Sequence, residues 1–152
     1  MNFRTVTLSL VMALACAGAA CADGAIGQVK TAKGGNVFVQ HAADPKQNEL
    51  KVGAHVSQSD VIITGPGSSV GITFTDNSMM SLGPNSKLVL KQYSFNPTTR
   101  EGEFNSFLAK GTLAAKSGQM VVQKPEAMKI QTPTAQLGVK GTEFVVHVDG
   151  EG

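Results

Sequence analysis

Short stretches in which apolar and polar residues alternate recur along the chain, and turn residues separate them. The clearest are residues 36–40, 60–65, 69–75, 86–92, 120–124, 128–132 and 142–148. A period of two is typical of β-strands with one buried face. In the last stretch, Phe144, Val146 and Val148 are expected to face one side, and Val145 and His147 the other. The pattern predicts an all-β fold.

The segments between these stretches have the composition of turns. They read GPGSS at 65–69, DNS at 76–78, GPNS at 83–86 and NPTT at 96–99. Glycine, asparagine and proline supply the special backbone angles of turns. The hairpin at DNS is expected to place Asn77 at positive φ, which asparagine tolerates better than most residues.

No segment has a convincing helical period with caps. Residues 102–116, GEFNSFLAKGTLAAK, come nearest, but Gly111 interrupts their apolar stripe and glycine is costly inside a helix. This segment is predicted to be strand and turn, with room for one short helical turn. Short strands with frequent turns indicate a sandwich, a barrel or a stack of strands. The small glycine-rich turns favour a β-roll or solenoid-like stack, although no exact repeat is present.

The first 22 residues have the pattern of a secretory signal peptide. Arg4 is their only charge, an apolar stretch follows it, and small residues end at Ala20-Cys21-Ala22. This pattern predicts cleavage before Asp23 and a periplasmic or secreted protein. One domain is then expected over residues 23–152.

Two alternatives to a cleaved leader stay open. An uncleaved membrane anchor needs about 20 apolar residues, and glycine, alanine and cysteine weaken the second half of this stretch. A lipid anchor on Cys16 or Cys21 lacks the leucine expected three positions upstream of either residue.

Composition excludes several kinds of site from the segment after the leader. Both cysteines lie in the leader, so a disulfide, a thiol nucleophile and a thiolate metal site are all excluded. The segment is also close to neutral, with its lysines spread along it. Nucleic-acid-binding proteins usually concentrate positive charge and aromatic residues on one face. Nucleic-acid binding is therefore not expected.

Lys140 lies between two glycines, in the order Gly-Val-Lys-Gly-Thr at 138–142. In a phosphate-binding loop the lysine follows the second glycine and a helix comes next. Here the order differs and a strand follows. Lys140 is therefore expected in a surface turn, with Gly141 supplying a bend before the last strand.

His147 and Asp149 are the weak candidates for metal binding, because they project from one face of the last strand two residues apart. Two ligands make a weak site, and no third ligand is identifiable. No serine, cysteine or carboxylate arrangement meets the geometric requirements of catalysis. Neither an enzymatic activity nor a cofactor is expected.

Three segments resemble the periplasmic domain of the FecR family, whose members include regulators of iron-siderophore uptake. Residues 27–39 begin with Gly-x-Val before a short strand. Residues 52–90 contain Asp-x-Ile-x-Thr-Gly, then Asp76-Asn77 at the family's Asp-Gly turn, then Ser86 at the serine of Leu-x-x-x-Ser. The third segment is similar to Thr-Pro-x-Ala followed by Val-Arg/Lys-Gly-Thr-x-Phe-x-Val. Its matching residues are Thr132, Pro133, Ala135, Val139, Lys140, Gly141, Thr142, Phe144 and Val146.

The resemblance implies a non-enzymatic, all-β domain that takes part in signalling across the cell envelope. It implies that Gly141 and Thr142 set the bend and that Phe144 and Val146 fill the core. The family's regulators carry a cytoplasmic segment that binds a sigma factor, followed by a membrane helix. Because a signal peptide is predicted here instead, this chain is not expected to transmit a signal inward by itself.

The leading functional expectation is a protein-binding or signalling-accessory module that engages an envelope protein. The family pattern commonly continues after its final valine, whereas this sequence ends at HVDGEG, so either the domain is minimal or the edge of the last strand is open. An open edge is a site for strand addition by a partner. The alternative is a carbohydrate or peptidoglycan-binding domain, for which a chain with one Tyr and no Trp offers few aromatic platforms.

Overall fold

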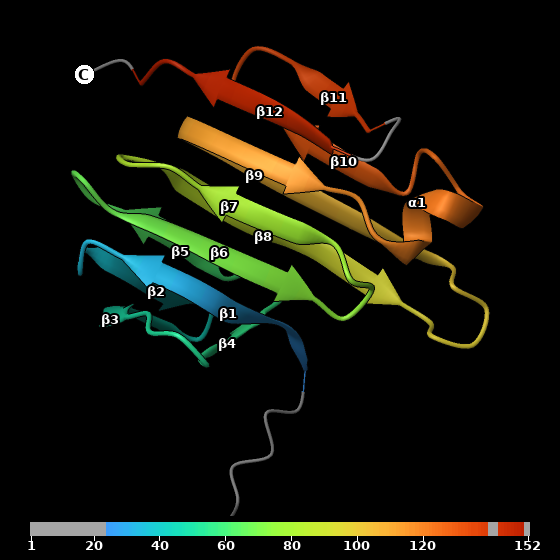
Figure 1. The fold of residues 1–152 in the computed structure, drawn as a ribbon, viewed down its shortest axis with the longest axis horizontal. Helices are drawn as coiled ribbons and strands as arrows, with labels where there is room; N and C mark the ends of the chain where they lie inside the picture. Colours follow the sequence, from blue (N-terminus) through green and yellow to red (C-terminus); the bar gives the residue numbers. More distant parts are fainter. Residues whose placement is uncertain (1–23, 140–142, 151–152) are drawn as a thin grey trace, which may run out of the picture.

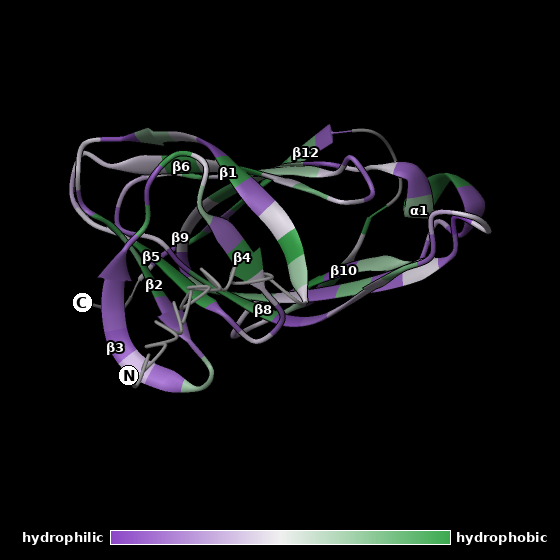
Figure 2. Cartoon of the chain, turned by 90° about the horizontal axis from the view of Figure 1, so that it is seen from below, coloured by the Kyte–Doolittle hydropathy of each residue, from purple (hydrophilic) through white to green (hydrophobic). Residues whose placement is uncertain are grey.

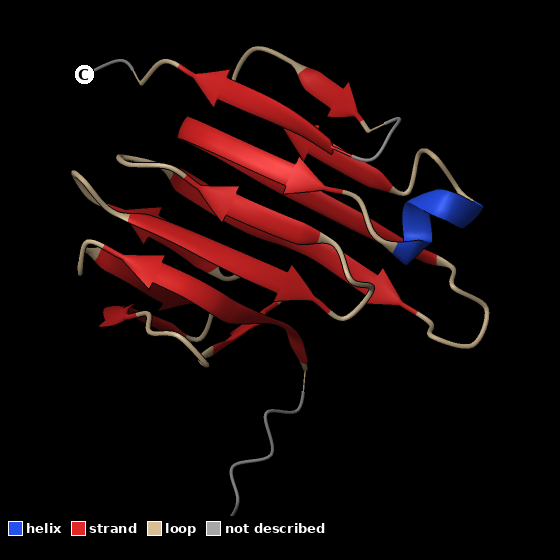
Figure 3. Ribbon diagram, in the orientation of Figure 1, coloured by secondary structure: helices blue, strands red, loops and turns tan. Residues whose placement is uncertain are grey.

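The computed structural model describes residues 24–139 and 143–150, which form strands and one short helix (Figure 3). The prediction of an all-β fold is thereby confirmed, whereas the predicted leader lies outside the described residues. The strands are β1 (Ala25–Lys33), β2 (Val37–His41), β3 (Asp44–Glu49), β4 (His55–Ser57), β5 (Val61–Thr64), β6 (Ser69–Phe74), β7 (Met79–Leu82), β8 (Lys87–Phe95), β9 (Gly102–Lys116), β10 (Met128–Gln131), β11 (Gln136–Gly138) and β12 (Glu143–Val148). The helix α1 is Gln119–Gln123.

The strands form one continuous sheet that curls into two facing layers (Figures 1 and 2). Their order is β3-β2-β5-β8-β9-β7-β6-β1-β4, and both β12 and the β10–β11 hairpin are attached to β9. Apart from the parallel β9–β10 pair, the pairings are antiparallel. A solenoid-like stack would pair parallel strands from successive coils. That part of the prediction is therefore not what the chain forms.

Strand β9 belongs to both layers. Its first half pairs with β8 on one side and β10 on the other, and its second half pairs with β7 and β12. Gly111 lies between the two halves at φ +94°, and a Cβ there would overlap Ser86. The glycine that interrupts the apolar stripe in the sequence therefore marks the crossing point of one long strand.

The core lies between the two layers and is built from the alternating apolar residues. One layer contributes Val29, Ile72, Phe74, Met80, Leu82 and Leu113, and the other contributes Val37, Ile62, Leu88, Leu90, Phe104 and Leu108. Phe74 of the first layer meets Phe104 of the second with ring centroids 4.8 Å apart, and Tyr93 lies 5.2 Å from Phe104. This aromatic contact joins the layers across the interior.

The prediction of a strand at 120–124 is wrong, because this segment forms α1. Met120 and Val121 are adjacent in sequence and both are buried, whereas a strand would point them to opposite faces. The helical turn is closed by the Lys124 N–H, which donates to the Met120 carbonyl at 3.0 Å. Sequence alternation was misleading here because Val122 is exposed and does not continue the apolar face.

The β6–β7 hairpin has the turn that the sequence predicts. Asn77 has φ +66°, and its N–H donates to the Phe74 carbonyl at 3.0 Å. Of the two methionines that follow, Met80 is buried and Met79 is exposed. The hairpin thus sets the strand so that Met80 enters the core.

Candidate interaction edge

The described part of the sheet has four edge strands, which differ in how well they are protected. β3 contains Pro45 and Lys46, and β4 and β11 have three residues each. β12 has six residues and contains neither proline nor lysine. Native edge strands are protected from further pairing by shortness, by proline and by lysine. β12 is therefore the least protected edge among the described strands.

Strand β12 lies antiparallel to β9, with Glu143 opposite Lys116 and Val148 opposite Gly111. It pairs with no other described strand, so its second row of backbone donors and acceptors is free to pair. Val145 stands in the middle of the strand and is 66% exposed. An exposed valine on a free edge is suited to contact another strand.

The two faces of β12 are as the alternation predicts. Phe144, Val146 and Val148 pack against the core, and Val145 and His147 are exposed. The core-facing residues are only partly buried, because β12 is the last strand of its layer. Phe144 and Val146 therefore lie at the margin of the core and do not fill its centre.

A groove of about 370 Å³ runs between β12 and the end of the other layer. Val146 and Val148 line one side. Ala135, which precedes β11, and Leu137, within β11, line the other. Leu137 is exposed on this side of the molecule. The free edge of β12 thus lies beside a groove of mixed polar and apolar lining, which includes Thr132 and Thr134 and can receive side chains of an added strand.

Thr132 and Pro133, from the third family-like segment, lie in the turn between β10 and β11. The Thr132 N–H donates to the Ala135 carbonyl at 2.7 Å, and the Thr132 Oγ1 accepts the Ala135 N–H at 3.0 Å. These bonds fix the hairpin that forms one wall of the groove. Lys140, Gly141 and Thr142 lie outside the described residues, so the predicted turn there stays a prediction.

Thr64 and Ser86, from the second family-like segment, form hydrogen bonds at the point where β9 passes from one layer to the other. The Ser86 N–H donates to Thr64 Oγ1 at 2.9 Å, and Thr64 Oγ1 donates to the Gly83 carbonyl at 2.6 Å. The Ser86 Oγ accepts the Thr112 N–H at 3.0 Å, directly beside Gly111. Both side chains are buried. Thr64 and Ser86 therefore stabilise the fold, because their buried, hydrogen-bonded hydroxyls are not accessible to a ligand.

Asp60, the acid of the same segment, is also a fold residue. It is 2% exposed, accepts the Ser57 N–H at 2.8 Å and lies 3.0 Å from His41 Nδ1. A buried carboxylate is stable only with such partners. Sequence reasoning did not pair Asp60 with His41, since nothing local links residues so far apart in the chain.

Comparison with known families decides the identity of the domain. The family model described as FecR protein matches residues 60–152, which is more than half of the chain. The chain belongs to the FecR family. The match begins at Asp60, so it includes Thr64, Ser86 and the whole of β12. No curated protein and no solved structure matches the chain.

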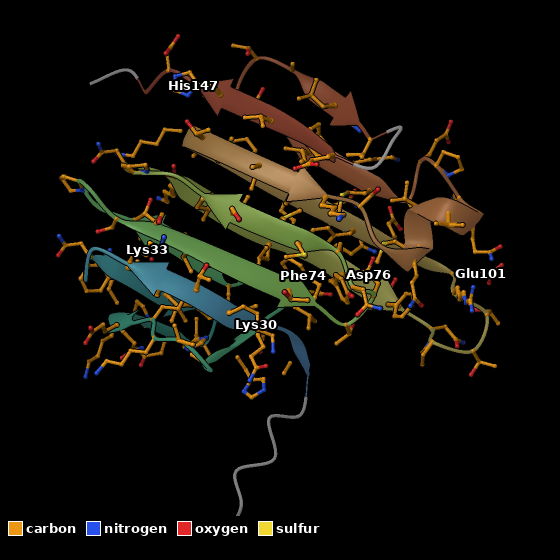
Figure 4. All side chains as sticks on the ribbon, in the orientation of Figure 1. Lys30, Lys33, Phe74, Asp76, Glu101 and His147 are labelled. Atoms are coloured by element: carbon orange, nitrogen blue, oxygen red, sulfur yellow. The ribbon has the colours of Figure 1, made fainter. Side chains whose placement is uncertain are left out.

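The two metal-ligand candidates of this FecR protein contact each other, and His147 also contacts Thr112. His147 Nε2 lies 3.0 Å from Asp149 Oδ1, and His147 Nδ1 lies 2.8 Å from Thr112 Oγ1. Figure 4 places His147 at the end of β12, far from Asp76. Within residues 24–139 and 143–150 no group of three histidine, cysteine or acidic residues is arranged to hold a metal. His147 and Asp149 therefore stand as a hydrogen-bonded pair at the β12 edge.

A second polar cluster of the FecR protein joins the β6–β7 turn to Tyr93 of β8. Tyr93 Oη lies 2.7 Å from Thr75 Oγ1 and accepts the Asp76 N–H at 3.1 Å, and Ser78 Oγ donates to Asp76 Oδ1. Burial raises the pKa of Tyr93 to about 12, because the ionised phenol is poorly solvated there. Gly118 packs directly over this turn. Asp76 and Ser78 are fully buried, so these contacts support the hairpin.

In the described part of the FecR protein, no aromatic side chain is fully exposed. Phe74, Tyr93 and Phe104 are buried, whereas Phe38, Phe95, Phe107 and Phe144 are partly buried.

No helix of the described residues has the length and apolar character needed to cross a membrane.

Proposed function

We propose that this FecR protein is an exported, non-enzymatic binding module that serves a signalling system of the cell envelope. In this proposal it resides in the periplasm and binds an extended segment of an envelope protein along β12. Export rests on the signal-peptide pattern of residues 1–22. The signalling role rests on membership of the FecR family.

The observation that carries the proposal is the free edge of β12. It is six residues long, lacks proline and lysine, and presents Val145 in an exposed position. In strand addition, backbone hydrogen bonds supply affinity and alternate side chains supply specificity. An added strand has a row of backbone groups to pair with, and its inward side chains enter the groove beside Val146, Val148 and Leu137.

The carbohydrate or peptidoglycan alternative has less support. Rings that stack on sugars have to be exposed, and the described aromatic side chains are buried or partly buried. The grooves at the β12 edge are lined by aliphatic, proline, glycine and threonine residues and by Asn85, Lys110, His147 and Asp149. These grooves therefore offer a sugar no phenyl, phenol or indole ring on which to stack.

A site-specific crosslink tests the proposal. The full-length chain with Cys16→Ala, Cys21→Ala and Val145→Cys carries one cysteine, to which a photo-activated crosslinker is attached in envelope extract. Ser81→Cys in place of Val145→Cys is the matched control, because Ser81 is exposed in the same cross-strand row two strands further in. The crosslinked segment is identified by mass spectrometry and made as a peptide.

The proposal predicts that this peptide binds the purified chain and that Val145→Lys weakens the binding by about tenfold or more, since an edge lysine opposes strand addition. Ser81→Lys should leave the affinity unchanged. Equal capture from positions 81 and 145, or a peptide whose affinity is unaffected by Val145→Lys, would refute binding at the β12 edge.

A further inference from the structure

Strand β12 is complementary to a second copy of itself. Its exposed side presents Glu143, Val145 and His147 in that order, so a carboxylate and an imidazole flank a central valine. Two such strands running antiparallel bring the acid of each opposite the histidine of the other. We infer that β12 of a second copy occupies this edge when no other partner strand is bound. The inference rests on the proposed function, because it uses the same free edge.

Antiparallel pairing restricts the register of such a dimer. Residues directly opposite each other in an antiparallel pair lie on the same face of the sheet. Pairing about Val145 satisfies this rule and keeps the core-facing residues together. It places Val145 opposite the partner's Val145, Glu143 opposite the partner's His147 and Phe144 opposite the partner's Val146.

Two neighbouring registers also place core-facing residues opposite core-facing residues, but their side-chain pairs are less favourable. Pairing about Val146 places Glu143 opposite the partner's Asp149, which sets two carboxylates against each other. Pairing about Phe144 leaves Val146 and His147 without an opposing residue within β12. Opposite charges directly across a strand pair stabilise it and like charges destabilise it. The register about Val145 is therefore the one selected by charge and by length.

Behind β12, in the same cross-strand row as Val145, lie Ala114 on β9 and Ser81 on β7. A second copy would therefore meet β12 on the opposite side of this row, at its free edge. The other three edges of the described sheet are blocked by Pro45 and Lys46 or have only three residues. Self-association thus extends one layer through β12 and leaves the opposite end of the sheet free.

Self-pairing also regulates the proposed function. A partner strand and the second copy compete for the same backbone groups, so partner binding has to displace the dimer. The apparent affinity for a partner strand is then expected to fall as the concentration of the chain rises.

Cysteine crosslinking tests the register. In the full-length chain with Cys16→Ala and Cys21→Ala, Val145→Cys places two thiols across the axis, where opposite Cβ atoms are about 5 Å apart. Mild oxidation should yield a disulfide-linked dimer of Val145→Cys and little dimer of the control Ser81→Cys. A mixture of Glu143→Cys and His147→Cys chains should give more mixed dimer than either chain gives with itself.

Two outcomes would overturn the inference. One is crosslinking of Val145→Cys no better than that of Ser81→Cys. The other is crosslinking of Glu143→Cys and of His147→Cys each to itself as well as to the other. If the peptide defined above still binds along β12 in either case, the second-copy inference fails while the proposed function stands. If β12 neither self-associates nor binds that peptide, both fail.

Sedimentation measurements test the charge complementarity independently. Glu143→Gln should weaken self-association by about tenfold, since each dimer loses two cross-strand carboxylate–imidazole contacts while residue 143 stays compatible with Lys116, which lies opposite it on β9. The exchange variant Glu143→His with His147→Glu restores the opposite pairs and should recover dimerisation. Failure of the exchange variant to recover, in a protein with unchanged circular dichroism, would contradict the pairing of these residues.

Discussion

Strands β9 and β12 are neighbours in one sheet, yet they have different roles. β9 is paired along both sides and carries fully buried residues such as Phe104 and Leu108. β12 is paired along one side, and its inward residues lie at the margin of the core. The stability of the FecR protein should therefore be concentrated on β9, while the surface available for recognition lies on β12.

The largest expected effect compares two phenylalanines. Phe104→Ala on β9 should cost roughly 3 to 5 kcal/mol of unfolding free energy, because it removes a fully buried ring that contacts both layers. Phe144→Ala on β12 should cost only about 1 to 2 kcal/mol, because its ring is partly exposed. Urea unfolding followed by circular dichroism measures both. Equal losses would show that β12 belongs to the core as much as β9 does.

The next effect concerns the crossing point of β9. Gly111→Ala should cost roughly 3 kcal/mol, because an alanine is strained at φ +94° and its Cβ would overlap Ser86. Gly35→Ala is the matched control, since Gly35 also has positive φ but faces open space. It should cost about 1 kcal/mol. If both substitutions lower the free energy of unfolding equally, the packing of Ser86 against Gly111 does not stabilise the point where β9 passes between the layers.

Local sequence signals predicted most strands and the facing of β12. Alternation succeeds there because each strand has one buried side, as Val145 and Val146 illustrate. β3 escaped prediction because all six of its residues are exposed, so no alternation marks it. α1 was taken for a strand because a five-residue helix is too short to display a helical period.

The candidate site was predictable only in part. An open edge was one of two alternatives raised by comparison with the family pattern. The sequence could not decide between them, because whether an edge is free depends on which strands lie beside it in the whole sheet. The groove beside Leu137 and the pairing of Asp60 with His41 arise from residues distant in sequence. No local pattern reveals such contacts. The bend proposed for Gly141 and Thr142 lies outside the described residues and stays a prediction.

A smaller effect tests the aromatic contact on the β9 side. Tyr93 lies opposite Phe104 on β9, and burial raises its pKa to about 12 from an ordinary value of 10.0. The unfolded chain therefore ionises first as pH rises from 10 to 12, so the folded protein should lose on the order of 1 to 3 kcal/mol of stability over that range.

Because the chain has one tyrosine and no tryptophan, ultraviolet absorbance follows the ionisation of Tyr93 directly. Tyr93→Phe should remove its part of the pH dependence while wild type retains it. An absorbance midpoint near pH 10 in the folded protein would contradict the buried, hydrogen-bonded phenol.

The smallest effect on stability compares the two histidine–aspartate pairs. His41 and His147 each lie 3.0 Å from a carboxylate, but Asp60 is 2% exposed and Asp149 is 98% exposed. His41→Ala should cost about 1 to 2 kcal/mol, because it leaves a buried carboxylate oxygen without its partner. His147→Ala should leave unfolding in dilute solution unchanged, because water replaces its contacts. It should nevertheless weaken self-association in the sedimentation assay, since it removes the group that faces the partner's Glu143. A His147→Ala protein that unfolds more readily but dimerises normally would reverse the assignment of β12 as a surface for recognition.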